Sequence, residues 1–95
     1  MEILNRNQIN EKLKSLKDWQ YGEESIIKNF TFKDFKEALA FMVKTGAVAE
    51  ELNHHPNWSN TYNKVNIKLS THDAGGVTEK DFELAERIEF MLKTS

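Results

Sequence analysis

The chain has 95 residues, of which 39% are hydrophobic and 29% are charged, and its formal net charge is −2. This composition is too apolar for disorder and typical of a globular protein, so we expect a single domain over residues 1–95. The charge balance offers no basic surface for neutralising phosphates, which argues against a nucleic-acid partner. The sequence has no cysteine, which excludes disulfides, thiol catalysis and thiolate zinc sites.

No targeting or membrane segment stands out in the sequence. The first six residues lack the basic-then-apolar order of a signal peptide. The longest apolar run, residues 38–49, is broken by Lys44 and is shorter than the about 20 residues that a membrane span needs. We therefore expect a cytoplasmic protein with no membrane partner.

The first half of the chain predicts a helix, two strands and a long helix. Asn7 is expected to cap a helix over residues 8–17. A short strand at residues 19–21 and a turn at residues 22–25 lead to a strand over residues 26–32, which is rich in β-branched and aromatic types. A helix over residues 33–53 follows, and its expected apolar stripe consists of Phe35, Leu39, Met42, Ala49 and Leu52. Gly46 is costly inside a helix, which suggests the close approach of another element.

The second half predicts two strands and a final helix. Pro56 disfavours helical geometry in the residue before it, so the long helix is expected to end at the His54-His55-Pro56 segment. Residues 64–70 alternate apolar and polar side chains as in a half-buried strand, which places Thr71 on the buried side and His72 on the polar side. Residues 78–81 resemble a capping box that opens the last helix. The prediction is an α+β fold, with about four antiparallel strands and three helices on one face, in the order α-β-β-α-β-β-α.

All three histidines lie in one short segment. His54 and His55 are expected at the end of the long helix and His72 at the end of a strand, so they can converge at the rim of the sheet. Histidine has an ordinary pKa of about 6.5 and so exchanges protons near neutral pH. The concentration of this residue type in one place therefore indicates a proton-transfer site.

Structural roles and a zinc site are the alternatives. His55 would also be favourable as a cation at a helix C-terminus, and Asp81 stands where a capping acid would stand. Three histidines can hold zinc, but the two that are adjacent here would be strained as joint ligands, and the helical His-Glu-x-x-His pattern is missing.

The spacing of these residues resembles the pterin-4a-carbinolamine dehydratase family. An acid is followed at the family's intervals by His-His-Pro, an aromatic residue, a third histidine and an aspartate; here these are Glu50, His54, His55, Pro56, Tyr62, His72 and Asp81. Residues 30–35 also resemble the family, and the similarity extends over about residues 19–92.

The resemblance implies dehydration of 4a-hydroxytetrahydropterin to quinonoid dihydropterin, which recycles tetrahydrobiopterin. It implies that His54 and His72 are the principal acid and base, and that His55 positions the pterin and makes a smaller catalytic contribution. Asp81 joins this catalytic set and Glu50 the substrate-binding set, where both carboxylates are expected to orient the imidazoles. It further implies that Ser70, Thr71 and Asp73 bind the pterin ring and that Trp58 packs near it. Asn53 replaces an acid found in some relatives, which leaves a hydrogen bond to the pterin as its expected role.

The expected partners are the pterin and other copies of the chain. No cofactor and no metal are expected, since the pterin is the substrate. The resemblance implies a homodimer or homotetramer, and it also leaves open a different function, that of an oligomerisation or transcriptional-cofactor module that binds protein.

Overall fold

The computed structural model describes residues 2–94 and has three α-helices and four strands. The elements in chain order are α1 (Arg6–Leu13), β1 (Gln20–Gly22), β2 (Ser25–Thr31), α2 (Phe35–Leu52), β3 (Asn57–Thr61), β4 (Lys64–Leu69), the short 3₁₀ helix η1 (His72–Ala74) and α3 (Glu79–Thr94). The predicted α+β class and the order α-β-β-α-β-β-α are confirmed. None of the helices within residues 2–94 is long and apolar enough to cross a membrane.

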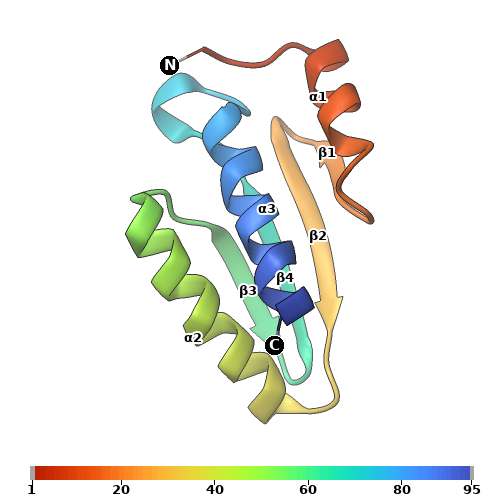
Figure 1. Ribbon diagram of the computed structural model, residues 1–95, viewed down its shortest axis with the longest axis vertical. Coiled ribbons are helices and arrows are strands. Elements are labelled where there is room, and N and C mark those ends of the chain that lie inside the picture. The colour runs from red at the N-terminus through yellow and green to blue at the C-terminus, as the bar shows by residue number, and fades with distance from the viewer. Residues whose placement is uncertain (1, 95) are drawn as a thin grey trace.

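The four strands form one antiparallel sheet in the order β1-β2-β4-β3. Helices α2 and α3 lie side by side across one face of this sheet, and α1 lies next to β1 (Figure 1). The predicted alternation in β4 is confirmed, because Val65, Ile67 and Leu69 are buried while the residues between them are not. The sheet therefore has one face covered by helices and one open face.

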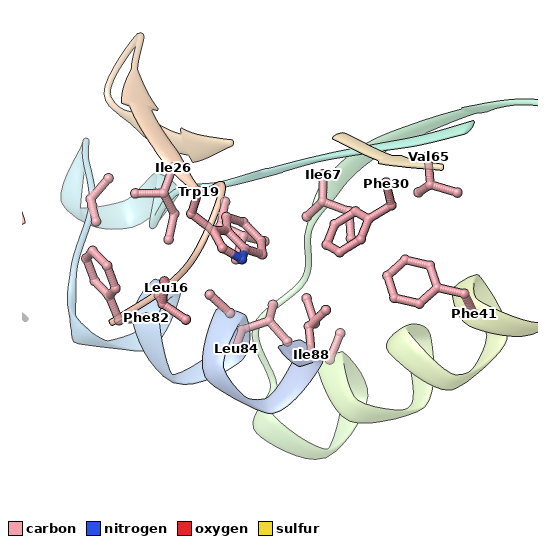
Figure 2. Close-up of a cluster of buried hydrophobic side chains, with 14 of the residues drawn as sticks. Leu16, Trp19, Ile26, Phe30, Phe41, Val65, Ile67, Phe82, Leu84 and Ile88 are labelled. Atoms are coloured by element: carbon pink, nitrogen blue, oxygen red, sulfur yellow. The ribbon is translucent and has the colours of Figure 1, made fainter. Parts of the chain in front are cut away.

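The core lies between the sheet and the two long helices. Figure 2 shows Phe30 and Ile67 of the strands directed toward Phe41 of α2 and Ile88 of α3. Trp19, from the segment before β1, fills the space beside Phe30, with the two rings edge to face at 6.0 Å. Each large apolar side chain buried in this way contributes about 1.5–3 kcal/mol, so this layer is the main source of stability.

The predicted apolar stripe of α2 is partly wrong. Phe35 and Leu39 are 45% and 47% exposed. The residues of α2 that are buried are Ala38, Phe41, Thr45 and Ala49. Two apolar stripes run along this helix, and pattern alone does not distinguish them. Packing selects the stripe with more small residues, which lets the helix approach the sheet; a Cβ placed at Gly46 would lie 3.9 Å from the Trp58 ring.

The predicted start of α1 is also wrong by two residues. Asn5, and not Asn7, is the N-cap: its side chain accepts from the amide of Gln8, and the Gln8 side chain accepts from the amide of Asn5. This reciprocal pair requires Glu or Gln three residues after the cap, and only Asn5 has one. The helix ends at Leu13, four residues before the predicted end.

Candidate functional site

A hollow of about 330 Å³ lies where the C-terminal end of α2, the end of β4 and the first turn of α3 meet. In Figure 1 this is the upper end of the sheet, near the start of α3. The hollow is lined by Asn53, His54, His55, Ser70, Thr71, His72, Asp73 and Lys80. The structure thus brings together seven residues that the sequence analysis assigned to the site.

The end of α2 explains why two adjacent histidines point in different directions. Asn53 adopts the left-handed conformation (φ 52°), which asparagine tolerates better than most residues, and its amide donates to the last turn of the helix. The amide of His54 then donates to the carbonyl of Ala49 at 3.0 Å. After this reversal His54 turns inward, whereas His55 remains exposed.

His54 is held by a buried carboxylate. Its Nε2 lies 2.5 Å from Oδ1 of Asp81, whose side chain is fully buried, while the His54 side chain is 11% exposed. The two residues are 27 positions apart and come from different helix ends. Truncating His54 would leave a buried charge without this partner, which is costly, so the pair is a fixed feature of the fold.

The Asp81 carboxylate is well satisfied, because two further hydrogen bonds reach its other oxygen. Oδ2 accepts from the amide of Thr78 and from the hydroxyl of Thr71, each at 2.9 Å. The bond to Thr78 is the predicted capping interaction at the start of α3. The capping role and the imidazole-orienting role of Asp81 therefore coexist, one on each carboxylate oxygen.

This arrangement determines the tautomer of His54. An ionised carboxylate only accepts hydrogen bonds, so Nε2 of His54 is the donor and carries a proton. Neutral His54 then has its lone pair on Nδ1. Within residues 2–94, the buried side-chain polar atom without a hydrogen-bond partner is Thr45 Oγ1. Nδ1 of His54 also has no partner in that range. Since it is not among the buried atoms without a partner, it is open to solvent. His54 can accept a proton from a ligand in the hollow.

His72 lies on a loop that is closed by backbone hydrogen bonds. The amide of Thr71 donates to the carbonyl of Gly76 at 2.8 Å, and η1 occupies the loop between them. Gly75 has φ 79°, a conformation that favours glycine. Gly76 is in close contact with Ile3, because an added Cβ would lie 3.2 Å from that side chain. His72 itself is exposed and lines the hollow.

His55 and Glu50 form an exposed pair at the rim. Nε2 of His55 lies 2.9 Å from Oε1 of Glu50, and both side chains are mostly exposed. An exposed pair of this kind contributes at most about 1 kcal/mol. His55 lines the hollow, whereas Glu50 reaches it only through His55.

Sequence reasoning missed Lys80. This residue lies in the first turn of α3 and lines the hollow together with the histidines. No carboxylate pairs with it within residues 2–94, whereas the neighbouring Glu79 pairs with Lys12 at 2.7 Å. A cation is unfavourable at a helix N-terminus, so an unpaired lysine there was a usable signal.

Two aromatic residues, Tyr62 of the motif and Trp58, lie away from the hollow. Trp58 is on β3 and its ring packs toward Gly46 under α2. Tyr62 is 63% exposed in the β3–β4 turn, at the opposite end of these strands from His72. The predicted contact of Trp58 with the pterin is therefore not formed by the hollow within one chain. The part of the chain from residue 2 to residue 94 also contains no group of three or more histidine or acidic side chains placed to hold a metal ion.

Comparisons with known proteins agree with one another. The family model described as Pterin 4 alpha carbinolamine dehydratase matches residues 2–91. A Christiangramia forsetii protein provisionally named pterin-4-alpha-carbinolamine dehydratase is 46% identical over 95 residues, which cover 100% of this chain and 98% of the relative. A Sinorhizobium medicae protein with the same provisional name is 50% identical over 90 residues, covering 93% and 86% of the two chains.

Two solved structures are similar as well. A Brucella melitensis protein described as a transcriptional coactivator/pterin dehydratase superposes with a TM-score of 0.90 at 41% identity, covering 93% of this chain and 96% of its own. A pterin dehydratase-like protein identified as a RuBisCO assembly factor in the α-carboxysome has a TM-score of 0.64 at 28% identity, covering 76% and 86%.

Proposed function

Because the chain belongs to the pterin-4a-carbinolamine dehydratase family, we propose that it removes water from a 4a-hydroxytetrahydropterin to give quinonoid dihydropterin, and so recycles tetrahydrobiopterin. The observation that carries this proposal is the placement of His54, fixed by Asp81, and of His72 in one hollow. Two imidazoles thus face the same ligand space from different elements.

The reaction needs two proton transfers and the cleavage of one bond. The lone pair of N5 forms the C4a=N5 double bond as the C4a–O bond breaks, the departing oxygen takes a proton and leaves as water, and N5 loses its proton. No electrons are exchanged with a second molecule, so we propose a reaction without a cofactor or metal. Each positioned acid or base contributes about 10²–10⁴-fold.

The geometry around His54 suits the role of base. Its Nδ1 accepts the N5 proton, and the buried carboxylate of Asp81 stabilises the imidazolium that forms. His72, which is exposed and free of a carboxylate partner within residues 2–94, donates a proton to the departing oxygen. The Lys80 ammonium favours the negative charge that develops on this oxygen.

The remaining lining residues bind and orient the pterin in this proposal. Asn53, Ser70 and the Asp73 carboxylate supply hydrogen-bonding groups, and the carboxylate suits the two adjacent N–H donors of the pterin pyrimidine edge. His55 adds a further contact at the rim. The Thr71 hydroxyl is already bonded to Asp81, so Thr71 acts as a support for the site.

The direct test is to generate the carbinolamine in solution and to measure its dehydration with and without the purified protein. We expect acceleration above the spontaneous rate, and loss of at least about 10²-fold in kcat for His54→Ala and for His72→Ala. A Trp58→Phe variant is the control, with a much smaller loss expected. If the wild-type protein gives no acceleration, the chain is not a dehydratase.

A second candidate function is protein binding, and the outer face of α2 favours it. Phe35, Leu39 and Val43 follow one another at four-residue spacing and are 45–67% exposed. Exposed apolar stripes of this kind are typical of association surfaces. We propose that copies of the chain associate as a dimer or tetramer through this face.

The mass of the protein in solution tests this association. A Leu39→Glu Val43→Glu variant is expected to lower the mass to that of the monomer, and Lys44→Glu, also exposed on α2, is the matched control for added charge. A wild-type protein that is monomeric at micromolar concentration would contradict the proposal.

A further inference from the structure

We propose that Thr78 is a positioning residue that keeps both histidines aligned, acting through the hydroxyl of Thr71 and the carboxylate of Asp81. The inference rests on the proposed dehydratase function and adds a residue that does not line the hollow. Thr78 is fully buried, so its side chain cannot reach a ligand there. Its effect on the site is therefore indirect.

The directions of the hydrogen bonds in the cluster of Thr71, Thr78 and Asp81 follow from the number of protons available. Asp81 only accepts, so the single proton of the Thr71 hydroxyl is given to Oδ2 of Asp81 at 2.9 Å. The Thr71 oxygen lies 2.6 Å from the Thr78 oxygen and must accept there. Thr78 in turn accepts from the amide of Lys80 at 3.2 Å, so its own proton is directed to Thr71. Both hydroxyl groups thus donate in the same direction, toward the carboxylate that holds His54.

The cluster joins the two segments that carry the histidines. Thr71 immediately precedes His72, and Asp81 binds His54. The Thr71–Asp81 bond therefore links the end of β4 to the start of α3, and Thr78 fixes the rotamer of Thr71 that makes this bond. A shift of Thr71 would move the His72 loop and release Oδ2 of Asp81 at the same time.

An ordinary helix cap would not require this arrangement. A capping threonine needs only its oxygen, which accepts an amide of the first turn, and its proton is free to face water. Here the hydroxyl is sealed from water and its proton has one receiver, Thr71. The positioning role therefore depends on the proton of Thr78, and the capping role depends on its oxygen.

The test compares Thr78→Val, which keeps the shape and loses the hydroxyl, with Thr78→Ser, which keeps the hydroxyl. Thr45→Val is the matched control, because Thr45 is also a fully buried threonine but its hydroxyl has no hydrogen-bond partner within residues 2–94. We expect Thr78→Val to lower kcat for carbinolamine dehydration about five- to tenfold with KM nearly unchanged, as for loss of one hydrogen bond in a network on a charged group. Thr78→Ser is expected to restore kcat, and Thr45→Val to leave it unchanged.

Two further measurements separate positioning from stability and from the proposed function. The first is the proton NMR signal of Nε2–H in His54, which we expect to exchange with water faster in Thr78→Val than in wild type and Thr45→Val. This readout does not depend on dehydratase activity, so it tests the positioning role even if the wild-type protein proves inactive. The second is Thr78→Val in an Asp81→Asn background, where we expect a smaller loss of kcat than in the wild-type background, because the part of the effect that passes through Asp81 to His54 is already absent.

Three results would overturn the inference: an unchanged kcat in folded Thr78→Val, an equal loss in Thr78→Val and Thr78→Ser, or unchanged exchange of the His54 proton. The equal loss would mean that the methyl packing of Thr78 matters and its hydroxyl does not.

Discussion

The Asp81→Asn substitution changes one atom group at the centre of the site and is expected to reverse the tautomer of His54. The Thr78 amide can only donate, so the carbonyl oxygen of the introduced side chain must face it. The opposite orientation would place two donors against each other inside the protein, at a cost of about 1–3 kcal/mol. The new NH₂ group therefore faces Nε2 of His54, where the carboxylate Oδ1 lies now.

The expected decrease of kcat in Asp81→Asn follows from the loss of the base. When Nε2 accepts from the introduced NH₂ group, the proton of His54 moves to Nδ1, the atom that is open to solvent. His54 then cannot take the N5 proton, and the contribution of a positioned base, about 10²–10⁴-fold in kcat, is lost. KM is expected to change little, since the imidazole ring keeps its place.

The assay combines kinetics with nitrogen NMR. Dehydration of the carbinolamine gives kcat and KM, and the ¹⁵N signals of His54 report which ring nitrogen carries the proton. Glu79→Gln is the matched control, because it removes a carboxylate from the same helix turn but one that is exposed and paired with Lys12. A folded Asp81→Asn protein with kcat within about threefold of wild type would refute the assignment of His54 as the base. Retention of the Nε2–H tautomer in this variant would refute the hydrogen-bond argument itself.

Substitutions at three further positions test the roles of single side chains. His55→Ala is expected to lower kcat less than about tenfold, in contrast to His54→Ala, because His55 is exposed and has no buried partner; equal losses in the two variants, measured as kcat, would contradict this difference. Lys80→Ala is expected to lower kcat about tenfold and Lys80→Arg to restore most of it, since a positive charge is what the departing oxygen requires; an unchanged kcat in Lys80→Ala would remove Lys80 from the mechanism. Leu84→Ala should lower the free energy of unfolding by about 2–5 kcal/mol in urea titrations, because this side chain is fully buried between α3 and the sheet; a loss below about 1 kcal/mol would mean that the core collapses around the cavity.

Much of the fold could be read from local pattern. The alternation in β4 and the capping residues before α3 each involve neighbours in the sequence, and the structure confirms both. The exposed stripe of α2 could not be predicted in the same way. Phe35 and Leu39 satisfy helical periodicity as well as Ala38 and Phe41 do, and only the shape of the facing sheet selects the second set.

The sequence by itself placed three histidines and an aspartate at the spacing of one enzyme family, and from that spacing predicted a proton-transfer site. It assigned each residue to the end of an element, because capping and periodicity act over three or four residues. Only the tertiary structure decided where each of these side chains lies and what it contacts. His54 meets Asp81 across 27 positions, His55 turns outward and Lys80 enters the hollow, and these outcomes depend on how α2, β4 and α3 pack together. Burial then gives the Asp81 carboxylate its hydrogen-bond pattern, and with it the tautomer on which the proposed chemistry depends.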